Sequence, residues 1–177
     1  MIFEELKIKG AFLIHGEPFI DERGYFRRNF CENEFIKHGI VTSISQANIS
    51  ENNYKYTLRG FHYQLPPNGE NKTMTILKGR IYDIIVDLRE DSNTYLQWVS
   101  FELTPDMRTS FHVPSGCANA FLTMKDDTMV HYYSSHPYTP SSERGIRYND
   151  PLFNFDWPIA KPEHISDKDA GWLDFIE

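Results

Sequence analysis

Short segments in which apolar and polar residues alternate dominate the chain from about residue 43 onward. In residues 81–88 (IYDIIVDL), the even-numbered positions carry only Tyr, Ile, Val and Leu, whereas the odd-numbered positions include Asp83 and Asp87. A two-residue period is that of an extended chain, whose side chains point alternately to opposite faces. Similar segments cover residues 73–77, 96–103, 108–113, 118–124 and 128–135. Turns at a spacing of roughly ten residues separate them, which predicts an antiparallel sandwich or small barrel.

Asp83 and Asp87 share a predicted strand face with two isoleucines. A barrel with a polar, ligand-facing lining would place carboxylates there. The alternative is an exposed outer face that carries two carboxylates without a role. The alternation alone leaves both interpretations open.

Helical periodicity is scarce, and the best helical segment is short, residues 32–38 (ENEFIKH), before Gly39. No internal repeat or linker interrupts the chain, so we expect a single domain over residues 1–177. The segment after Asp150 is rich in proline, aspartate and aromatic residues. We expect this tail to dock against the barrel through four aromatic side chains, Phe153, Phe155, Trp157 and Trp172.

Composition narrows the possible functions. The chain is 40% hydrophobic and 15% aromatic, which excludes a disordered protein. Its net charge of −7 disfavours general nucleic-acid binding, so an anionic small molecule would need a local group of Arg or Lys side chains. Two cysteines are too few for a disulfide scaffold and suit a reducing compartment. With no secretory signal and no apolar run of about 20 residues, we expect a cytoplasmic protein without a membrane partner.

The densest group of reactive residue types lies in residues 57–67 (TLRGFHYQLPP), followed by Lys72. Arg59 and His62 are close in sequence, and Gly60 between them would allow a ligand to approach the backbone. Taken alone, a histidine among aromatic residues is more often structural than catalytic. The Arg and Lys beside it shift that balance only modestly.

Six segments in order along the chain resemble the nucleoside-diphosphate-4-keto-sugar epimerases typified by dTDP-4-dehydrorhamnose 3,5-epimerase. They are residues 21–26 (DERGYF), 46–50 (QANIS), 58–67 (LRGFHYQLPP) with Lys72, 113–118 (VPSGCA), 142–151 (SERGIRYNDP) and 165–169 (ISDKD). The resemblance implies an all-β, cupin-type antiparallel jelly-roll barrel, usually a homodimer, without metal or cofactor. The residues agree on metal, because His62 lacks the closely spaced second histidine of metal-binding cupins, and His131 and His136 are scattered.

The resemblance also implies roles for four catalytic residues. His62 would be the general base, since imidazole titrates near neutral pH, and Asp169 would orient it. Lys72 would stabilise the enolate oxygen. Tyr132 would donate the proton on the opposite face of the sugar. The neighbouring Tyr133 leaves the register open by one residue, although alternation allows only one of the two rings to face the interior.

The same resemblance implies a substrate-binding set. Arginines suit the diphosphate because their planar side chains make bidentate contacts to phosphate. Amides two residues apart on a strand would face the sugar or phosphate together, and an aromatic ring would stack on the base. The expected residues are Arg23, Phe26, Gln46, Asn48, Arg59, Asn119 and Tyr138.

Asn119 departs from the family pattern, in which a histidine is usual at this position. An amide forms hydrogen bonds but neither titrates nor carries charge. The leading interpretation is a cofactor-independent epimerase of a nucleotide-linked 4-keto-6-deoxy sugar. Alternatives are epimerisation at one carbon only, a CDP- or GDP-linked keto-sugar or heptose, a sugar 3,4-ketoisomerase, and a non-catalytic nucleotide-sugar binder.

Overall fold

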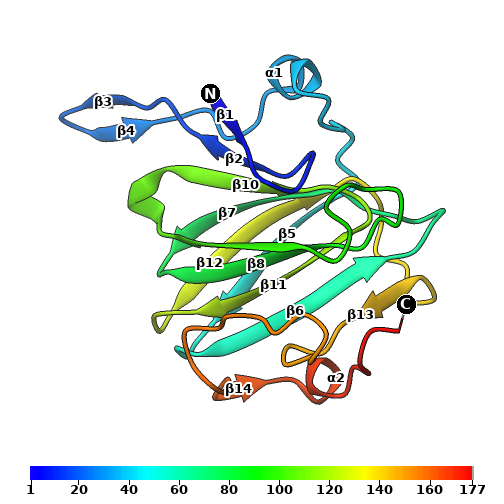
Figure 1. The fold of residues 1–177 in the computed structure, drawn as a ribbon. Coiled ribbons are helices and arrows are strands. Elements are labelled where there is room, and N and C mark those ends of the chain that lie inside the picture. Colours follow the sequence, from blue (N-terminus) through cyan, green and yellow to red (C-terminus); the bar gives the residue numbers. More distant parts are fainter. Residues whose placement is uncertain (177) are drawn as a thin grey trace.

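Two β-sheets face each other in the computed structural model, which describes residues 1–176 (Figure 1). The first sheet has the order β1 (Ile2–Glu5), β2 (Phe12–His15), β10 (Thr109–Val113), β7 (Lys72–Lys78), β12 (Thr128–Ser134) and β5 (Gln46–Asn52). The second has the order β13 (Glu143–Gly145), β6 (Thr57–Gln64), β11 (Cys117–Thr123), β8 (Ile81–Asp87) and β9 (Trp98–Leu103). β14 (His164–Ile165) adds to β6 in parallel, and every other pairing is antiparallel. The expected all-β fold is confirmed.

The predicted elements lie close to the observed ones, with three kinds of difference. Helix α1 (Glu32–Lys37) ends one residue early, and β9 begins two residues late because residues 92–97 form hydrogen-bonded turns. A 3₁₀ turn, η1 (Pro105–Met107), and a short helix, α2 (Asp167–Ala170), were not predicted. Neither were the strands before residue 43, which have only three or four residues each and are too short to show a period.

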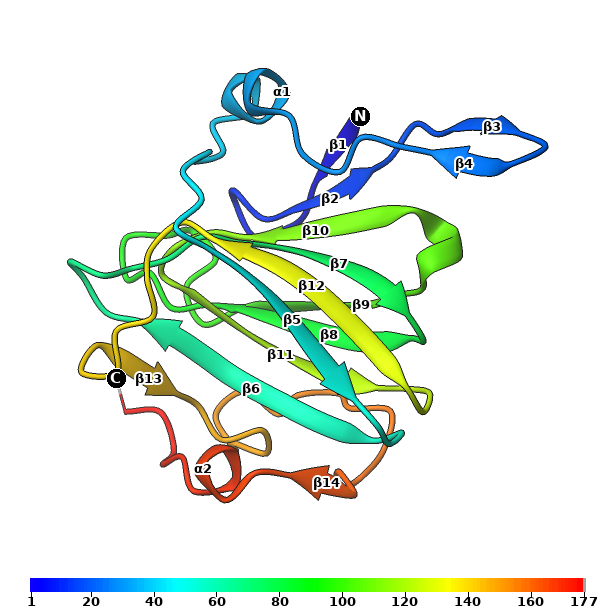
Figure 2. The ribbon, with the colours of Figure 1, turned by 180° about the vertical axis from the view of Figure 1, so that it is seen from behind.

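The unpredicted strands β3 (Phe19–Asp21) and β4 (Gly24–Phe26) form a hairpin that projects from the sheets (Figures 1 and 2). Its apolar side chains are exposed, including Phe19 at 78% and Phe26 at 72%. Apolar side chains gathered in this way on one projecting element differ from the single apolar side chains that are scattered over most protein surfaces.

The alternation of β8 divides its side chains between two cores. Ile81 and Ile85 pack between the sheets with Phe111 and Val130. Asp83 and Asp87 lie on this same inner face and are fully buried, so the interpretation of an exposed outer face is wrong. The outward face of β8 is not exposed either, because the C-terminal tail covers it.

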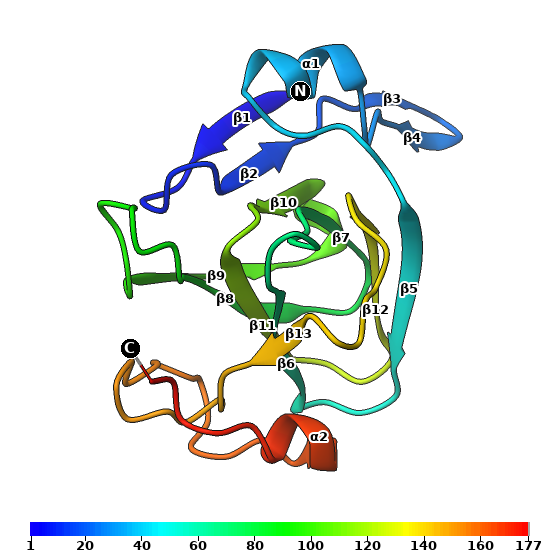
Figure 3. The ribbon, with the colours of Figure 1, turned by 90° about the vertical axis from the view of Figure 1, so that its right-hand side faces the viewer.

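The tail docks on the barrel through all four predicted aromatic residues. The Phe155 ring stacks on Phe61 at 4.4 Å and on Phe153 at 5.0 Å, and Trp157 packs beside them. Trp172 lies elsewhere, against Gly145, with its ring centroid 6.5 Å from that of His62. Seen end-on, the tail and α2 lie outside β6, on the side opposite α1 (Figure 3). No helix of residues 1–176 is long and apolar enough to cross a membrane.

Gly60 is required by a close backbone contact. Its φ is +124°, and a Cβ there would lie 2.5 Å from Ala120 Cα and 2.6 Å from the Asn119 carbonyl oxygen. Gly24 has a similar φ of +125° with nothing within 4 Å of a Cβ. Alanine at either position would therefore carry backbone strain, but only alanine at position 60 would also collide with a neighbouring strand.

We predict that Gly60→Ala lowers the free energy of unfolding by about 1–3 kcal/mol more than Gly24→Ala. Urea titration of the two variants measures the difference. Equal losses in the two variants would show that β11 moves aside without cost.

His112 makes stability depend on pH. Its ring on β10 is 2% exposed, and Nδ1 lies 2.8 Å from Thr73 Oγ1. Burial lowers the pKa of His112 from 6.5 to about 4. Between these values the unfolded state binds a proton that the folded state does not. Stability is therefore lost as the pH falls from 6.5 towards 4.

We predict that the parent loses about 2 kcal/mol more stability than His112→Leu between about pH 7.5 and about pH 5. Urea titrations of both proteins at each pH measure this difference, in which the contributions of other groups cancel. Parallel losses in parent and variant would contradict it.

Candidate active site

A cavity of about 620 Å³ lies between the two sheets. β5, β7 and β12 supply its lining from the first sheet, and β6, β11 and β13 from the second. Most of the predicted site residues line it, namely Gln46, Asn48, Arg59, His62, Lys72, Asn119, Tyr132 and Tyr138. The fold thus gathers in one place residues that are far apart in the sequence.

His62 on β6 is held by Asp169, the predicted orienting acid. His62 Nε2 lies 2.7 Å from Asp169 Oδ1, and Asp169 Oδ2 accepts a hydrogen bond from the Gly60 backbone N–H at 3.1 Å. Ser166 caps α2 by accepting from the Asp169 N–H at 3.1 Å, which fixes the carboxylate under the ring. Because an ionised carboxylate only accepts, Nε2 carries the hydrogen, and in a neutral ring the free lone pair is then on Nδ1.

The charge of Asp169 is stabilised inside the protein. Burial by itself would raise the pKa of this carboxyl. The hydrogen bond and charge of His62, the Gly60 N–H and the charge of Lys168 lower the pKa, and together they outweigh the effect of burial. The net pKa is below the usual value, so Asp169 is ionised at neutral pH. A fixed carboxylate stabilises the imidazolium that forms when His62 takes up a proton.

Lys72 provides a cation in the cavity wall. Its side chain is 12% exposed, and Nζ donates to the His62 carbonyl oxygen at 3.1 Å while pairing with Glu70 at 3.4 Å. Arg59, the second cavity cation, donates from Nε to Asn52 Oδ1 at 2.6 Å. Both cations are thus held in place, and preorganised charges stabilise a developing anion without reorganisation cost.

The structure shows which of the two adjacent tyrosines faces the cavity. Tyr132 lines the cavity, whereas Tyr133 faces away, with its ring against Phe30 and its hydroxyl accepting from Asn29 Nδ2 at 3.2 Å. Burial raises the pKa of Tyr132, and the Glu70 charge adds to the rise while Arg59 opposes it. The phenol therefore keeps its proton at neutral pH and can donate it.

The rim of the cavity carries an ion pair that the sequence analysis did not assign. Glu143 on β13 accepts from Lys168 Nζ at 2.6 Å and from the Tyr138 hydroxyl at 2.7 Å. Both charged residues lie within the family-like segments around 142–151 and 165–169, which is the signal that could have found them. Their contact joins the ring expected to stack on a base with the helix that carries Asp169.

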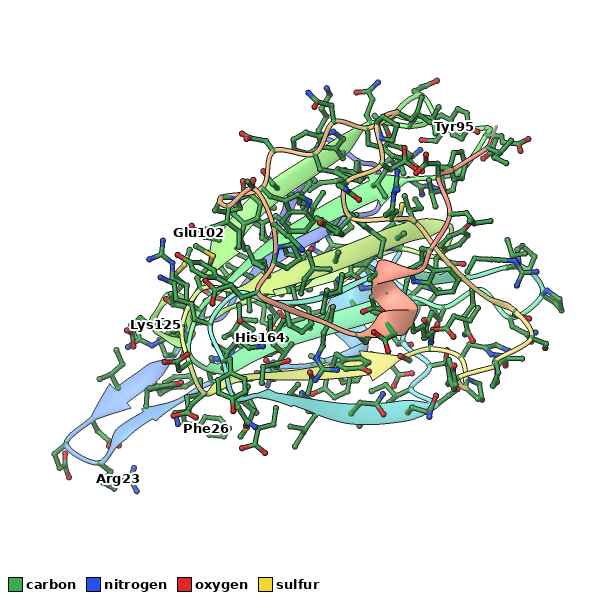
Figure 4. All side chains as sticks on the ribbon, turned by 90° about the horizontal axis from the view of Figure 1, so that it is seen from below. Arg23, Phe26, Tyr95, Glu102, Lys125 and His164 are labelled. Atoms are coloured by element: carbon green, nitrogen blue, oxygen red, sulfur yellow. The ribbon has the colours of Figure 1, made fainter. Side chains whose placement is uncertain are left out.

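Gln46 and Asn48 lie on the same face of β5, as the two-residue spacing predicted, and both line the cavity. Arg23 and Phe26 do not. They lie on the β3–β4 hairpin, where the Arg23 side chain is 83% exposed and pairs with Asp21 (Figure 4). The fold of a single chain therefore does not bring these two predicted binding residues to the cavity.

Asn119 lies beside His62, since the two Cα atoms pair across β11 and β6. Its side chain is buried and donates from Nδ2 to Asp83 Oδ2 at 3.0 Å. Within residues 1–176, no group of three or more His, Cys, Asp or Glu side chains is placed to hold a metal ion. Activity without metal or cofactor stays a prediction.

A histidine held by a buried carboxylate, a lysine and a phenol thus meet at one cavity between the sheets. These residue types suit an isomerase that moves protons on and off carbon. The family model for dTDP-4-dehydrorhamnose 3,5-epimerase matches residues 5–177, and the chain belongs to this family. A curated relative of this name from Methanothermobacter thermautotrophicus is 36% identical over 173 residues, which is 96% of this chain and 92% of the relative.

Solved structures agree with this assignment. The dTDP-4-dehydrorhamnose 3,5-epimerase of Bacillus anthracis, with TDP and PPi bound, matches with a TM-score of 0.94 at 32% identity, over 98% of this chain and 99% of that chain. ChmJ, a 3'-monoepimerase from Streptomyces bikiniensis in complex with dTDP-quinovose, matches with a TM-score of 0.89 at 28% identity, over 96% and 85% of the two chains. The expected cupin-type jelly roll is confirmed.

We predict that Asp169→Asn lowers kcat by about 100- to 10,000-fold with little change in KM, because the amide can neither fix the ring tautomer nor stabilise the imidazolium. Steady-state kinetics measure the effect. Asp167→Asn, an exposed position on the same helix, is the control and should behave like the parent. An Asp169→Asn variant with unchanged kcat would remove the dyad from the mechanism.

Proposed function

We propose that this protein epimerises a nucleoside-diphosphate-linked 4-keto-6-deoxy sugar without metal or cofactor. The observation that carries the proposal is the placement of His62 and Tyr132 on opposite sheets that face one cavity. A sugar bound between the sheets would present one face to the base and the other to the phenol. Inversion at carbon needs this arrangement, because the proton leaves one face and returns to the other.

The chemistry starts at a carbon next to the ketone. His62 Nδ1 takes the proton from that carbon, and the electron pair of the C–H bond moves into an enolate. Lys72 and Arg59 place positive charge in the same cavity, where the anion develops. Tyr132 then gives its hydroxyl proton to the opposite face of the same carbon, and the carbonyl re-forms. The imidazolium and the phenolate exchange protons with solvent before the next turnover.

The nucleotide diphosphate would lie towards Arg59, Gln46 and Asn48, with Tyr138 stacked on the base. The TDP named in the Bacillus anthracis structure and the dTDP-quinovose named in the ChmJ structure support such a ligand. We also infer a homodimer. The exposed β3–β4 hairpin supports this, because Arg23 and Phe26 would reach a substrate only in the cavity of a second copy.

A second candidate is epimerisation at one carbon only. Asn119 favours it, because an uncharged amide beside the base gives the cavity one titratable group fewer than a histidine would. The similarity to ChmJ supports the same candidate. A non-catalytic binder is disfavoured, since binding requires neither a base with an orienting acid nor a buried phenol. The free thiols of Cys31 and Cys117 support a cytoplasmic location.

Incubation with dTDP-4-keto-6-deoxyglucose in heavy water tests the proposal, with proton NMR of the product. Deuterium at C3 and C5 with inversion at both supports the 3,5-epimerase, and deuterium confined to one carbon supports the second candidate. Parallel reactions with CDP- and GDP-linked substrates identify the preferred nucleobase of the substrate. A protein that binds the nucleotide sugar but incorporates no deuterium is a binder.

We predict that Tyr132→Phe loses most epimer formation yet still exchanges deuterium into the substrate. The enolate still forms, and His62 returns a solvent-derived proton to the original face. Tyr133→Phe is the matched control, because that ring lies outside the cavity, and its turnover should be close to that of the parent. The opposite pattern, with inversion blocked only in Tyr133→Phe, would refute the assignment of Tyr132.

A further inference from the structure

The floor of the cavity contains a carboxyl group that the proton transfer does not use. Asp83 on β8 is fully buried, and its Oδ2 accepts a hydrogen bond from Asn119 Nδ2 at 3.0 Å. Its Oδ1 is also buried and has no hydrogen-bond partner within residues 1–176. Asn119 lines the cavity, whereas Asp83 lies behind it. The amide therefore separates a buried carboxyl from the space for the sugar.

One contact determines which side of the Asn119 amide faces the cavity. The nitrogen donates to Asp83 at 3.0 Å, and Asp83 lies behind the cavity lining, so this bond holds the nitrogen on the inner side. The nitrogen also lies 3.4 Å from the sulfur of Met74, a weak acceptor that lines the cavity. The side-chain carbonyl is then the polar atom directed towards the cavity. No residue of the described part of the chain donates a hydrogen bond to it.

We propose that Asp83 is a positioning residue that makes Asn119 a hydrogen-bond acceptor for a sugar hydroxyl, and that this contact selects substrates with a hydroxyl at C3. The inference rests on the proposed function. Asn119 lies next to His62, which faces the carbon that loses its proton. Of the two carbons beside a C4 ketone in a 6-deoxyhexose, C3 carries a hydroxyl, whereas C5 carries a methyl group and the ring oxygen.

The state of Asp83 supports this assignment. Burial raises the pKa of the carboxyl well above its usual range, opposed only in part by the Asn119 hydrogen bond and the Lys72 charge. A neutral carboxyl avoids the cost of a buried charge with one unpartnered oxygen, and its carbonyl oxygen still accepts from the amide. Asp83 thus orients Asn119 without adding a negative charge beside the enolate.

Ligand binding with and without a donor at C3 tests the proposal. The probes are dTDP-quinovose and its 3-deoxy-3-fluoro analogue, because fluorine keeps the approximate size of a hydroxyl but cannot donate. Isothermal titration calorimetry should show that the parent binds the fluoro analogue about five- to tenfold more weakly. The ratio should fall close to one in Asn119→Leu, which lacks the carbonyl.

The Asp83 variants separate positioning from binding. Asp83→Leu frees the amide to rotate and should also bring the ratio close to one. Asp83→Asn is the matched control, since its carbonyl can accept the same N–H, and it should keep the ratio of the parent. Circular dichroism checks that each variant is folded. If the larger leucine side chain prevents folding, Asp83→Ala replaces Asp83→Leu.

Equal or tighter binding of the fluoro analogue by the parent would overturn the proposal, because it would place the amide N–H towards the sugar. A ratio unchanged in Asn119→Leu would overturn it as well. A ratio that is lost in Asn119→Leu but unchanged in folded Asp83→Leu or Asp83→Ala would remove the role of Asp83. Failure of the parent to bind either probe would instead refute the dTDP-sugar function on which the inference rests.

Discussion

The hydrogen bond between His62 and Asp169 is the interaction on which the site depends, and it joins residues 107 positions apart. A buried carboxylate costs free energy unless several donors surround it. Asp169 finds them only where α2 meets β6, because the Gly60 N–H and the His62 ring both belong to that strand. The pairing of His62 with Asp169 therefore requires the C-terminal segment to pack against the barrel. The parallel pairing of β14 with β6, the ion pair of Lys168 with Glu143 and the contact of Trp172 with Gly145 hold it there.

The two sheets contribute different residues to the cavity. The second sheet carries His62 on β6 and Asn119 on β11, and the first carries Lys72 on β7 and Tyr132 on β12. Hydrogen-bonded strands on both sides keep His62 and Tyr132 apart, and the proposed epimerisation requires this separation, since each residue would serve one face of the sugar. The cavity lining carries two cations, Arg59 and Lys72, beside three carboxylates, Glu51, Glu70 and Glu143.

Much of this architecture follows from the sequence, because alternation sets both the strands and their faces. Alternation predicted that the rings of Tyr132 and Tyr133 face opposite sides of their strand. It also predicted that Gln46 and Asn48 share one face. It could not decide whether Asp83 faced solvent, because the face of β8 that turns inward is set by the opposite sheet, whose strands are distant in sequence. The β3–β4 hairpin escaped prediction because three residues show no period. The rim contact of Glu143 with Lys168 escaped it because ion pairs across the fold have no local pattern.

The position of the reactive residues along their strands explains how one barrel can be both a stable core and a polar cavity. Lys72 begins β7, and the antiparallel register places it beside Ser134 at the end of β12, which in turn pairs with Gln46 at the start of β5. In the second sheet, Glu143 pairs with Gln64 at the end of β6, two residues beyond the base. Further along the same strands, Ile76 and Val130 belong to the apolar core. Antiparallel pairing thus gathers the polar ends of five strands at one end of the barrel. The apolar remainder supplies the packing that holds them in place.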